Sequence, residues 1–347
     1  MPKDKKDKKR RRIDYDCFGN NKEWEYEEIN KEIKTLDDLI ELGEIYDRKK
    51  RKRYNLDLRK LSFLVTPLKK LKSIIGMEKV KKTIVGHIVY YVQDLEDNSS
   101  NMMHTVIQGP PGVGKTMLGR LIGDIYYKLG MLKSRHTIFD IDYTFKIARR
   151  SDLIGRYLGE TSIKTQKVID ECNGGVLFID EAYSLGNAEG RDSYSKECID
   201  TINQNLTENK SKFLCIIAGY KNDLEHCFFN YNSGLKRRFP FVYEIEKYTH
   251  EDIKKIFFKM VYEIGWCILS IDDNFFEKNY EFFPNFGGDI ETLLFKCKIE
   301  HSKRIICLSQ DHKKKLTKCD INNGFNEYKL NCQFKIVDNT SCEHLYL

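Results

Sequence analysis

The segment TVIQGPPGVGKT, residues 105–116, decides how this chain folds. It opens with an apolar run, continues through a turn of the form GxxxxGK(S/T), and leads into the helical pattern of residues 117–127. A strand, a glycine-rich turn and a helix in this order bring backbone N–H groups and the positive end of the helix dipole to one point. The segment therefore predicts a phosphate-binding loop. The residues that we assign to nucleotide binding here are Gly109, Pro110, Pro111, Gly112, Val113, Gly114, Lys115, Thr116 and Met117.

Two side chains at the end of this loop add chemistry that the backbone cannot supply. The Lys115 ammonium is expected to reach the β- and γ-phosphate oxygens of a nucleotide. The Thr116 hydroxyl is expected to be a ligand of Mg²⁺. The loop thus predicts a nucleotide bound together with Mg²⁺.

A second segment, VLFIDE at residues 176–181, has the pattern of a fully buried parallel strand that ends in two carboxylates. Such carboxylates lie at the carboxyl edge of the sheet, where ligands bind. Asp180 is expected to hold the Mg²⁺, directly or through water. Glu181 is expected to orient and polarise the water that attacks the γ-phosphate. The predicted catalytic residues are therefore Lys115 and Glu181, and the predicted metal ligands are Thr116 and Asp180.

From about Leu71 onward, strand-like apolar runs alternate with helical patterns, which is typical of an α/β fold with a parallel sheet flanked by helices. Thr249, three residues before Asp252, has the form of an N-cap that opens a small helical lid. A last lid helix is expected to start near Asp320, and the alternation after Asn331 predicts a short strand or a disordered end. We divide the chain into a basic N-terminal segment (1–70), a large nucleotide-binding subdomain (71–246), a helical lid (247–330) and a C-terminal tail (331–347).

The N-terminal segment carries the charge of the chain. Residues 1–72 hold 22 basic and 15 acidic residues, which gives the whole net charge of +7. Two blocks, Lys8–Arg12 and Arg48–Arg53, resemble both solvated flexible tails and patches that bind nucleic acid, an import receptor or an acidic protein. The sequence leaves these alternatives open. Apolar residues at three- and four-residue spacing between Ile29 and Ile40 predict an amphipathic helix in this otherwise partly flexible segment.

Composition excludes several other classes of protein. The 11 cysteines contain no CxxC pair and the 8 histidines form no cluster, so we expect reduced thiols and no structural metal. No apolar run approaches the roughly 20 residues of a membrane-spanning helix, and the charged N-terminus does not lead into a secretory signal. We expect an intracellular protein, cytoplasmic or nuclear, that is not secreted.

Five motifs in order resemble those of the AAA+ ATPases, a superfamily of P-loop NTPases. Their pattern is similar to the group that contains CbbX, the red-type Rubisco activase, and stage V sporulation protein K. The resemblance covers roughly Ile75 to Arg304 and implies that the nucleotide is ATP. The motifs are GPPGVGKT at 109–116, DLIGRYLGET at 152–161, GGVLFIDEAYSL at 174–185, AGY at 218–220 and NSGLKRRF at 232–239.

The resemblance implies roles for three further residues. Arg238 stands where the family places an arginine finger, which a neighbouring subunit inserts toward the γ-phosphate; Arg237 beside it is the competing assignment. A finger that acts between subunits implies a homo-oligomeric ring, usually a hexamer. Tyr157 lies in the segment of the first pore loop, where an aromatic side chain grips an extended polypeptide. Gly76 belongs to the element that packs against adenine.

Two departures from the family pattern affect how the site senses nucleotide. The polar sensor after the fourth strand is replaced by Gly219 and Tyr220, which leaves the Tyr220 hydroxyl or Asn222 as substitutes. The lid segment FGGDIE, residues 286–291, lacks the second sensor arginine.

The function that these features favour is ATP hydrolysis that drives remodelling of an unidentified protein client through an aromatic pore loop. One alternative is a nucleic-acid-directed ATPase, such as a helicase or a loader, which the basic blocks favour. Another is a nucleotide-gated scaffold with little turnover, which the missing lid arginine favours.

Overall fold

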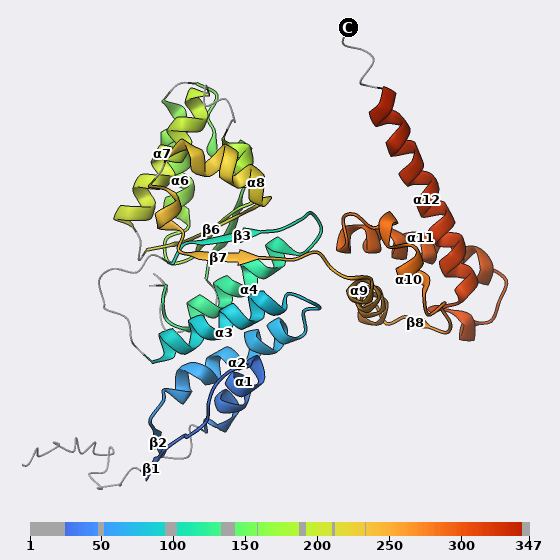
Figure 1. Ribbon diagram of the computed structural model, residues 1–347, viewed down its shortest axis with the longest axis horizontal. Coiled ribbons are helices and arrows are strands. Elements are labelled where there is room, and N and C mark those ends of the chain that lie inside the picture. The colour runs from blue at the N-terminus through green and yellow to red at the C-terminus, as the bar shows by residue number, and fades with distance from the viewer. Residues whose placement is uncertain are drawn as a thin grey trace, which may run out of the picture.

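A five-stranded parallel sheet forms the centre of the structure, with the strand order β4-β5-β6-β3-β7 (Figure 1). The computed structural model describes residues 25–47, 52–93, 103–132, 143–157, 159–186, 192–209, 212–232 and 234–341. The α/β fold with a parallel sheet that the sequence predicts is confirmed. The strands of this sheet are β3 (Thr105–Gln108), β4 (Phe145–Ala148), β5 (Val176–Ile179), β6 (Leu214–Gly219) and β7 (Phe241–Glu244).

Both faces of the sheet are buried, because alternate residues of its strands enter two separate apolar cores. Val176 and Phe178 of β5 belong to one core, and Leu177 and Ile179 belong to the other. Helices cover each face of the sheet in Figure 1. The covering helices are α3 (Glu78–Val92) and α4 (Lys115–Lys128) on one face and α6 (Glu160–Glu171) and α7 (Ser193–Glu208) on the other.

Two N-terminal helices, α1 (Leu36–Ile45) and α2 (Leu58–Lys72), extend the core on the side of α3 and α4 (Figure 1). A capping box between Thr35 and Asp38 begins α1, so this helix starts later than the apolar pattern of residues 29–40 predicts. Helix α2 ends at Lys72, so the boundary that we place at residue 70 falls inside its last turn. The short strands β1 (Glu25–Glu27) and β2 (Lys52–Tyr54) pair in parallel before it. The block Lys8–Arg12 and residues 48–51 of the second basic block lie outside the described residues.

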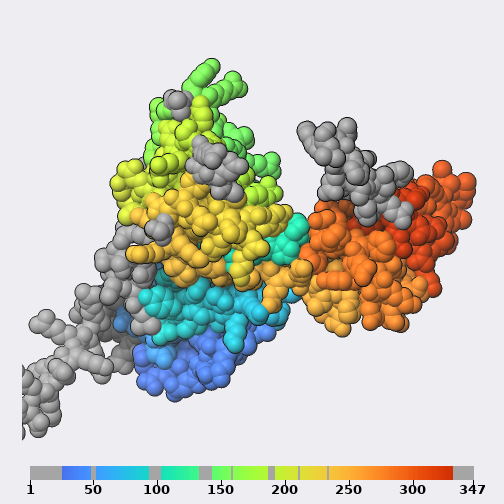
Figure 2. Space-filling view, turned by 45° about the horizontal axis from the view of Figure 1, so that its top comes forward, coloured from blue at the N-terminus to red at the C-terminus, as the bar shows by residue number. Residues whose placement is uncertain are grey.

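A helical lid follows β7. Its first helix begins with the predicted capping box, in which the Thr249 side chain accepts a hydrogen bond from the Asp252 N–H. In Figure 2 the orange and red lid lies beside the blue-to-yellow body and is joined to it at one side. The lid elements are α9 (His250–Glu263), β8 (Cys267–Ile268), α10 (Phe275–Lys278), α11 (Gly287–Ile305), β9 (Lys315–Leu316) and α12 (Lys318–Ser341).

The last helix corrects the prediction for the C-terminal tail. Residues 331–341 continue α12 and form neither a strand nor an irregular end. The helix starts at Lys318, close to the predicted start at Asp320, after Thr317 and Asp320 exchange hydrogen bonds between side chain and backbone. Once the first turn is fixed, each added residue costs little, so the helix extends over the short alternating pattern.

Two features are absent from the described residues. Among them, no helix combines the length and apolar character that crossing a bilayer requires. Within the described ranges, no group of three or more His, Cys, Asp or Glu side chains is placed so that it could hold a metal ion.

Candidate nucleotide-binding site

The glycine-rich loop leaves the sheet between β3 and helix α4. Gly112 and Gly114 have φ values of +68° and +86°, a left-handed conformation that strains any residue with a Cβ atom. Gly109 donates a backbone hydrogen bond to the carbonyl of Gly219 at the end of β6, which fixes the loop against the neighbouring strand. These conformations turn the chain so that α4 begins at Lys115 with its N-terminus facing the loop.

A cavity of about 260 Å³ lies between this loop and the carboxyl ends of β5 and β6. It brings together six of the residues predicted for nucleotide and metal binding, and the predicted catalytic Glu181. Tyr183 from the turn after β5, Gly219 at the end of β6 and Tyr220 directly after it complete the wall. The lining residues are Pro111, Gly112, Gly114, Lys115, Thr116, Asp180, Glu181, Tyr183, Gly219 and Tyr220.

Lys115 turns its side chain back over the loop. Its ammonium donates hydrogen bonds to the carbonyl oxygens of Gly109 (3.0 Å) and Pro110 (2.8 Å). Burial lowers the pKa of this ammonium, and the two carboxylates of the cavity act in the opposite direction. A half-buried cation beside two carboxylates but bonded only to neutral carbonyls is well suited to an anionic ligand.

The side chains of Asp180 and Thr116 make no hydrogen bond or ion pair with the other described residues. Both line the cavity, so their oxygens are available to a ligand. Glu181, directly after Asp180, has a left-handed backbone with φ of +51°, which is uncommon outside glycine and is typical of strained functional positions. The donor set therefore fits a hard divalent cation beside a phosphate group.

The other predicted binding residues lie outside this cavity. Gly109 and Pro110 line a second cavity of about 470 Å³ next to it, Val113 is buried, and the Met117 side chain is 50% exposed. Gly76 lies against the ring of Tyr248 with φ of +68°, and the Tyr248 hydroxyl donates a hydrogen bond to the Val113 carbonyl at 3.0 Å. One tyrosine thus connects the Gly76 turn to the loop.

The lid also contacts the loop through backbone atoms. The Gly287 N–H at the start of α11 donates to the Gly112 carbonyl at 3.1 Å, and the carbonyl of Asn285 packs against Gly112. No arginine is present at this point of the described lid, in keeping with the departure seen in the sequence.

Tyr157 lies in the turn between α5 (Arg150–Leu153) and α6, and its side chain is 75% exposed. Glu160 holds this turn, because one of its carboxylate oxygens accepts hydrogen bonds from the N–H groups of Arg156 (2.7 Å) and Tyr157 (3.2 Å). The bond from the Arg156 N–H, followed by the bond from the Tyr157 N–H, lowers the pKa of Glu160. The turn therefore presents the aromatic ring to solvent on a fixed backbone.

Arg238 and Arg237 differ in their surroundings. The Arg238 guanidinium donates hydrogen bonds to the Gly234 carbonyl (2.8 Å) and the Thr207 hydroxyl (2.6 Å), whereas Arg237 is exposed and has no side-chain partner among the described residues. Neither arginine lines the cavity of its own chain. An action on that cavity would have to come from a different subunit.

The fold and the cavity together define the class of protein: residues 105–247 match the AAA family, the ATPase family associated with various cellular activities. The chain belongs to the AAA ATPases and is related to the CfxQ/CbbX and Rubisco activase group. Proteins of this family bind ATP and typically form oligomers.

Individual relatives show how similar the chain is to particular proteins of this family. It is 42% identical over 303 residues to a putative CfxQ-like protein of Acanthamoeba polyphaga mimivirus, which covers 86% of this chain and 73% of the relative. It is 30% identical over 262 residues to the chloroplastic ribulose bisphosphate carboxylase/oxygenase activase of Cyanidioschyzon merolae, covering 72% and 85%. The crystal structure of the FIGL-1 AAA domain with ADP matches the fold with a TM-score of 0.51 and 19% identity, over 73% of this chain and 82% of that one.

Sequence reasoning missed two residues of this region. Tyr183 lines the cavity although only its neighbours Asp180 and Glu181 were assigned roles. Arg150 donates hydrogen bonds to the carbonyl of Ser184 and to the side chains of Asp192 and Ser195, so it joins α5 to the turn after β5 and to the start of α7. Neither residue has a sequence signal of its own, because its partners come from other elements.

Proposed function

We propose that this AAA ATPase uses ATP hydrolysis to remodel a protein partner, as a homo-oligomeric ring of six subunits with Tyr157 in the central channel. The observation that carries this proposal is the exposed aromatic ring of Tyr157 on a turn with a fixed backbone. An aromatic ring of this kind binds extended polypeptides through contact area and stacking, without demanding particular side chains.

The contacts of Arg150 support a link between hydrolysis and the pore loop. Its guanidinium bonds to the Ser184 carbonyl at 2.6 Å, three residues after Glu181, and forms an ion pair with Asp192 at 2.7 Å. The same residue starts α5, which leads to Tyr157. A shift of the turn that holds Glu181 therefore has a direct route to the loop.

In the proposed mechanism, Lys115 and the N–H groups of the loop bind and orient the phosphates of ATP. Thr116 and Asp180 would hold Mg²⁺, which when bound neutralises phosphate charge. Glu181 orients the attacking water and accepts its proton. Catalysis by these groups comes mainly from positioning and electrostatic stabilisation.

We assign the arginine finger to Arg238, which would stabilise the transition-state charge in the neighbouring subunit's cavity. Its bonds to Gly234 and Thr207 hold the guanidinium in one orientation, which limits the entropy lost when it docks. Arg237, which is exposed, is the matched control.

The ring is tested by mixing two inactive variants. Lys115→Ala subunits keep the finger and Arg238→Ala subunits keep the cavity, so a mixture regains part of the ATP turnover if the site is shared. Turnover per subunit of the unmodified chain should also rise with protein concentration. A mixture of the two inactive variants that stays inactive would speak against a shared site. Full activity of Arg238→Ala together with loss of activity in Arg237→Ala would instead move the finger by one residue.

Remodelling is tested with two probes of different chemistry, a permanently unfolded polypeptide (reduced, carboxymethylated α-lactalbumin) and single-stranded DNA. The polypeptide is expected to stimulate ATP turnover. Tyr157→Ala should abolish the stimulation, and Tyr157→Phe should keep it because the ring remains. Stimulation by DNA alone would favour the nucleic-acid-directed alternative, and tight ATP binding without turnover at any concentration would favour the scaffold.

A further inference from the structure

Two tyrosines from different elements form one wall of the nucleotide cavity. Tyr183 lies on the short helical turn η1 (Ala182–Leu185) after β5, and Tyr220 follows β6. Their rings stack with centroids 5.4 Å apart and an angle of 22° between the planes. Both side chains are half-buried and line the cavity beside Lys115 and Glu181.

The backbone around the pair is shaped to admit it. A Cβ atom on Gly219 would lie 2.9 Å from Cδ1 of Tyr183, so only glycine lets the ring take this position without a shift. Gly219 also accepts the backbone hydrogen bond from Gly109 of the phosphate-binding loop. The position of the ring of Tyr183 is thus coupled to the loop.

Tyr220 presents the face of its ring to Lys115. The Nζ atom lies 4.8 Å from the ring centroid, within the range of a cation–π interaction. Two of the three N–H groups of Lys115 are already used by the carbonyls of Gly109 and Pro110. A ring face attracts the ammonium without neutralising it, whereas a carboxylate at this place would compete with the phosphates. The contact therefore keeps a full positive charge at the cavity.

Tyr183 lies on the side of the pair away from Lys115's ring contact and lines the cavity together with Glu181. Burial raises the pKa of its hydroxyl, and the nearby charge of Glu181 adds to the rise. The phenol therefore stays neutral, and its ring is the surface on which Tyr220 stacks. Asn222, the other substitute that the sequence suggested, is exposed and does not line the cavity.

We propose that the stacked pair is a positioning device of the hydrolytic site, in which the ring of Tyr220 holds the Lys115 ammonium and the ring of Tyr183 holds Tyr220 in place. The pair stands at the place of the missing polar sensor and acts through the contact with Lys115. This inference rests on the role proposed above for Lys115.

The ring of Tyr220 is tested by equilibrium binding of ATP to the full chain. Tyr220→Leu should weaken binding about tenfold, and Tyr220→Phe should restore most of the loss because the ring face remains. Tyr262→Leu, which changes an exposed lid tyrosine, is the matched control and should bind normally. Equal losses in the leucine and phenylalanine variants would overturn the proposal, since the hydroxyl would then be the active group. So would normal binding by Tyr220→Leu.

The ring of Tyr183 is tested in the same binding assay. Tyr183→Leu removes the stacking partner of Tyr220 and should weaken ATP binding about threefold, whereas Tyr183→Phe keeps the stack and should bind normally. Equal losses in these two variants, or normal binding by Tyr183→Leu, would contradict the supporting role of the ring. Lys115→Ala separates the two levels of argument. If that variant binds ATP normally, the site assignment fails. If it loses binding while the tyrosine variants behave as the unmodified chain, only this inference fails.

Discussion

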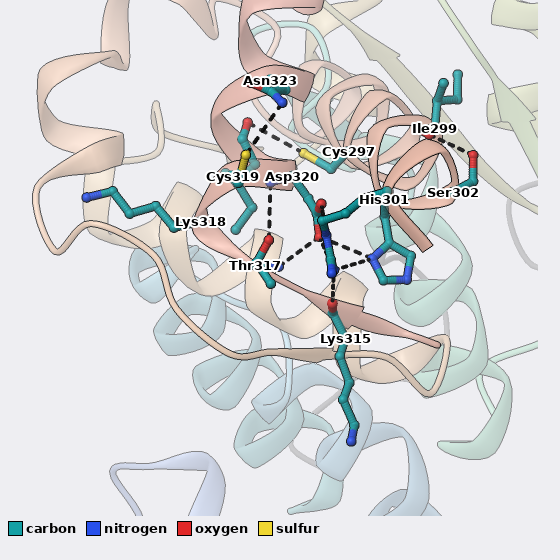
Figure 3. Close-up of polar contacts among 12 residues, drawn as sticks. Cys297, Ile299, His301, Ser302, Lys315, Thr317, Lys318, Cys319, Asp320 and Asn323 are labelled. Carbon is teal, nitrogen blue, oxygen red and sulfur yellow. Dashed lines mark hydrogen bonds and ion pairs between the residues drawn. The ribbon is translucent and has the colours of Figure 1, made fainter. Parts of the chain in front are cut away.

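Charged side chains gather in two places in this molecule, the nucleotide cavity and the interior of the lid, and their partners differ. In the cavity, no ion pair of the described structure joins Lys115 to Asp180 or Glu181. In the lid, Asp320 is 2% exposed and is surrounded by donors (Figure 3). The lid carboxylate receives bonds from Arg304 at 2.7 and 2.9 Å, from the Thr317 N–H at 3.0 Å, and lies 3.1 Å from Nδ1 of His301.

The difference shows which charges serve the fold and which are left for a ligand. A buried carboxylate without partners costs several kcal/mol, so the bonds around Asp320 are needed for the lid to form. The half-exposed groups of the cavity keep much of their hydration and need no such network. We therefore expect substitutions in the cavity to reduce activity at nearly constant stability, and substitutions in the lid cluster to do the reverse.

The largest effect is expected in the cavity. Lys115→Ala should abolish ATP binding, and Glu181→Gln should keep ATP bound while turnover falls by a factor of about 10³ or more. The free energy of unfolding of both variants should lie within about 0.5 kcal/mol of that of the unmodified chain, as is usual for surface substitutions. The measurements are nucleotide binding, steady-state turnover and urea unfolding. Normal hydrolysis by either variant would show that the cavity is misassigned.

The second-largest effect is expected from a substitution that breaks the cluster around Asp320 in the lid. Asp320→Ala leaves the Arg304 guanidinium and the Thr317 N–H without their carboxylate, and should lower the free energy of unfolding by about 3–5 kcal/mol. Arg304→Lys is the milder control, because it keeps the charge but loses the two-pronged contact. Urea unfolding followed by the fluorescence of Trp266, which packs against His301, reports on the lid directly. An unchanged midpoint for Asp320→Ala would mean that the cluster is not needed for folding.

A smaller loss of folding stability is expected when the pH is lowered. Burial alone would raise the pKa of Asp320, but the bonds from Arg304, Thr317 and His301 outweigh it and hold the pKa at about 2, below the ordinary 3.8. A group with a lowered pKa in the folded state stabilises the fold above its unfolded pKa. The Asp320 carboxylate should therefore contribute about 2 kcal/mol to the free energy of unfolding above pH 4. This contribution should disappear as the pH falls toward 2. Asp320→Asn should lack this part of the acid dependence of unfolding.

The sequence allowed the cavity to be predicted far better than the lid cluster, for a physical reason. Asp180 and Glu181 are adjacent, and the loop from Gly109 to Thr116 is one contiguous motif, so the local pattern already contains the geometry. Asp320 and His301 lie 19 residues apart and meet only when α11 packs on α12. No local pattern distinguishes a carboxylate that will be buried from one that stays in water.

The same reasoning explains what was missed near the cavity. The Tyr183–Tyr220 stack depends on β5 lying beside β6, a sheet order that spacing alone does not reveal. The starts of α1 and α12 have a local cause instead. Capping bonds of Thr35 and Thr317 set these two starts, and the bond of Thr35 outweighs the short apolar pattern that precedes it.

The smallest effect concerns a backbone contact between the loop of the cavity and the start of α11 in the lid. A Cβ atom on Gly112 would lie 1.8 Å from the carbonyl oxygen of Asn285, so Gly112→Ala must push the start of α11 away from the loop and lose the bond from Gly287. Gly130→Ala is the matched control, because Gly130 has a similar φ of +77° but open space around it. Both variants bear the backbone strain of about 1 kcal/mol. Only Gly112→Ala should also weaken ATP binding, by a few-fold for one lost hydrogen bond. Equal ATP affinity in the two variants would show that the cavity binds its nucleotide without help from the lid, and the charges of the lid would then serve the lid alone.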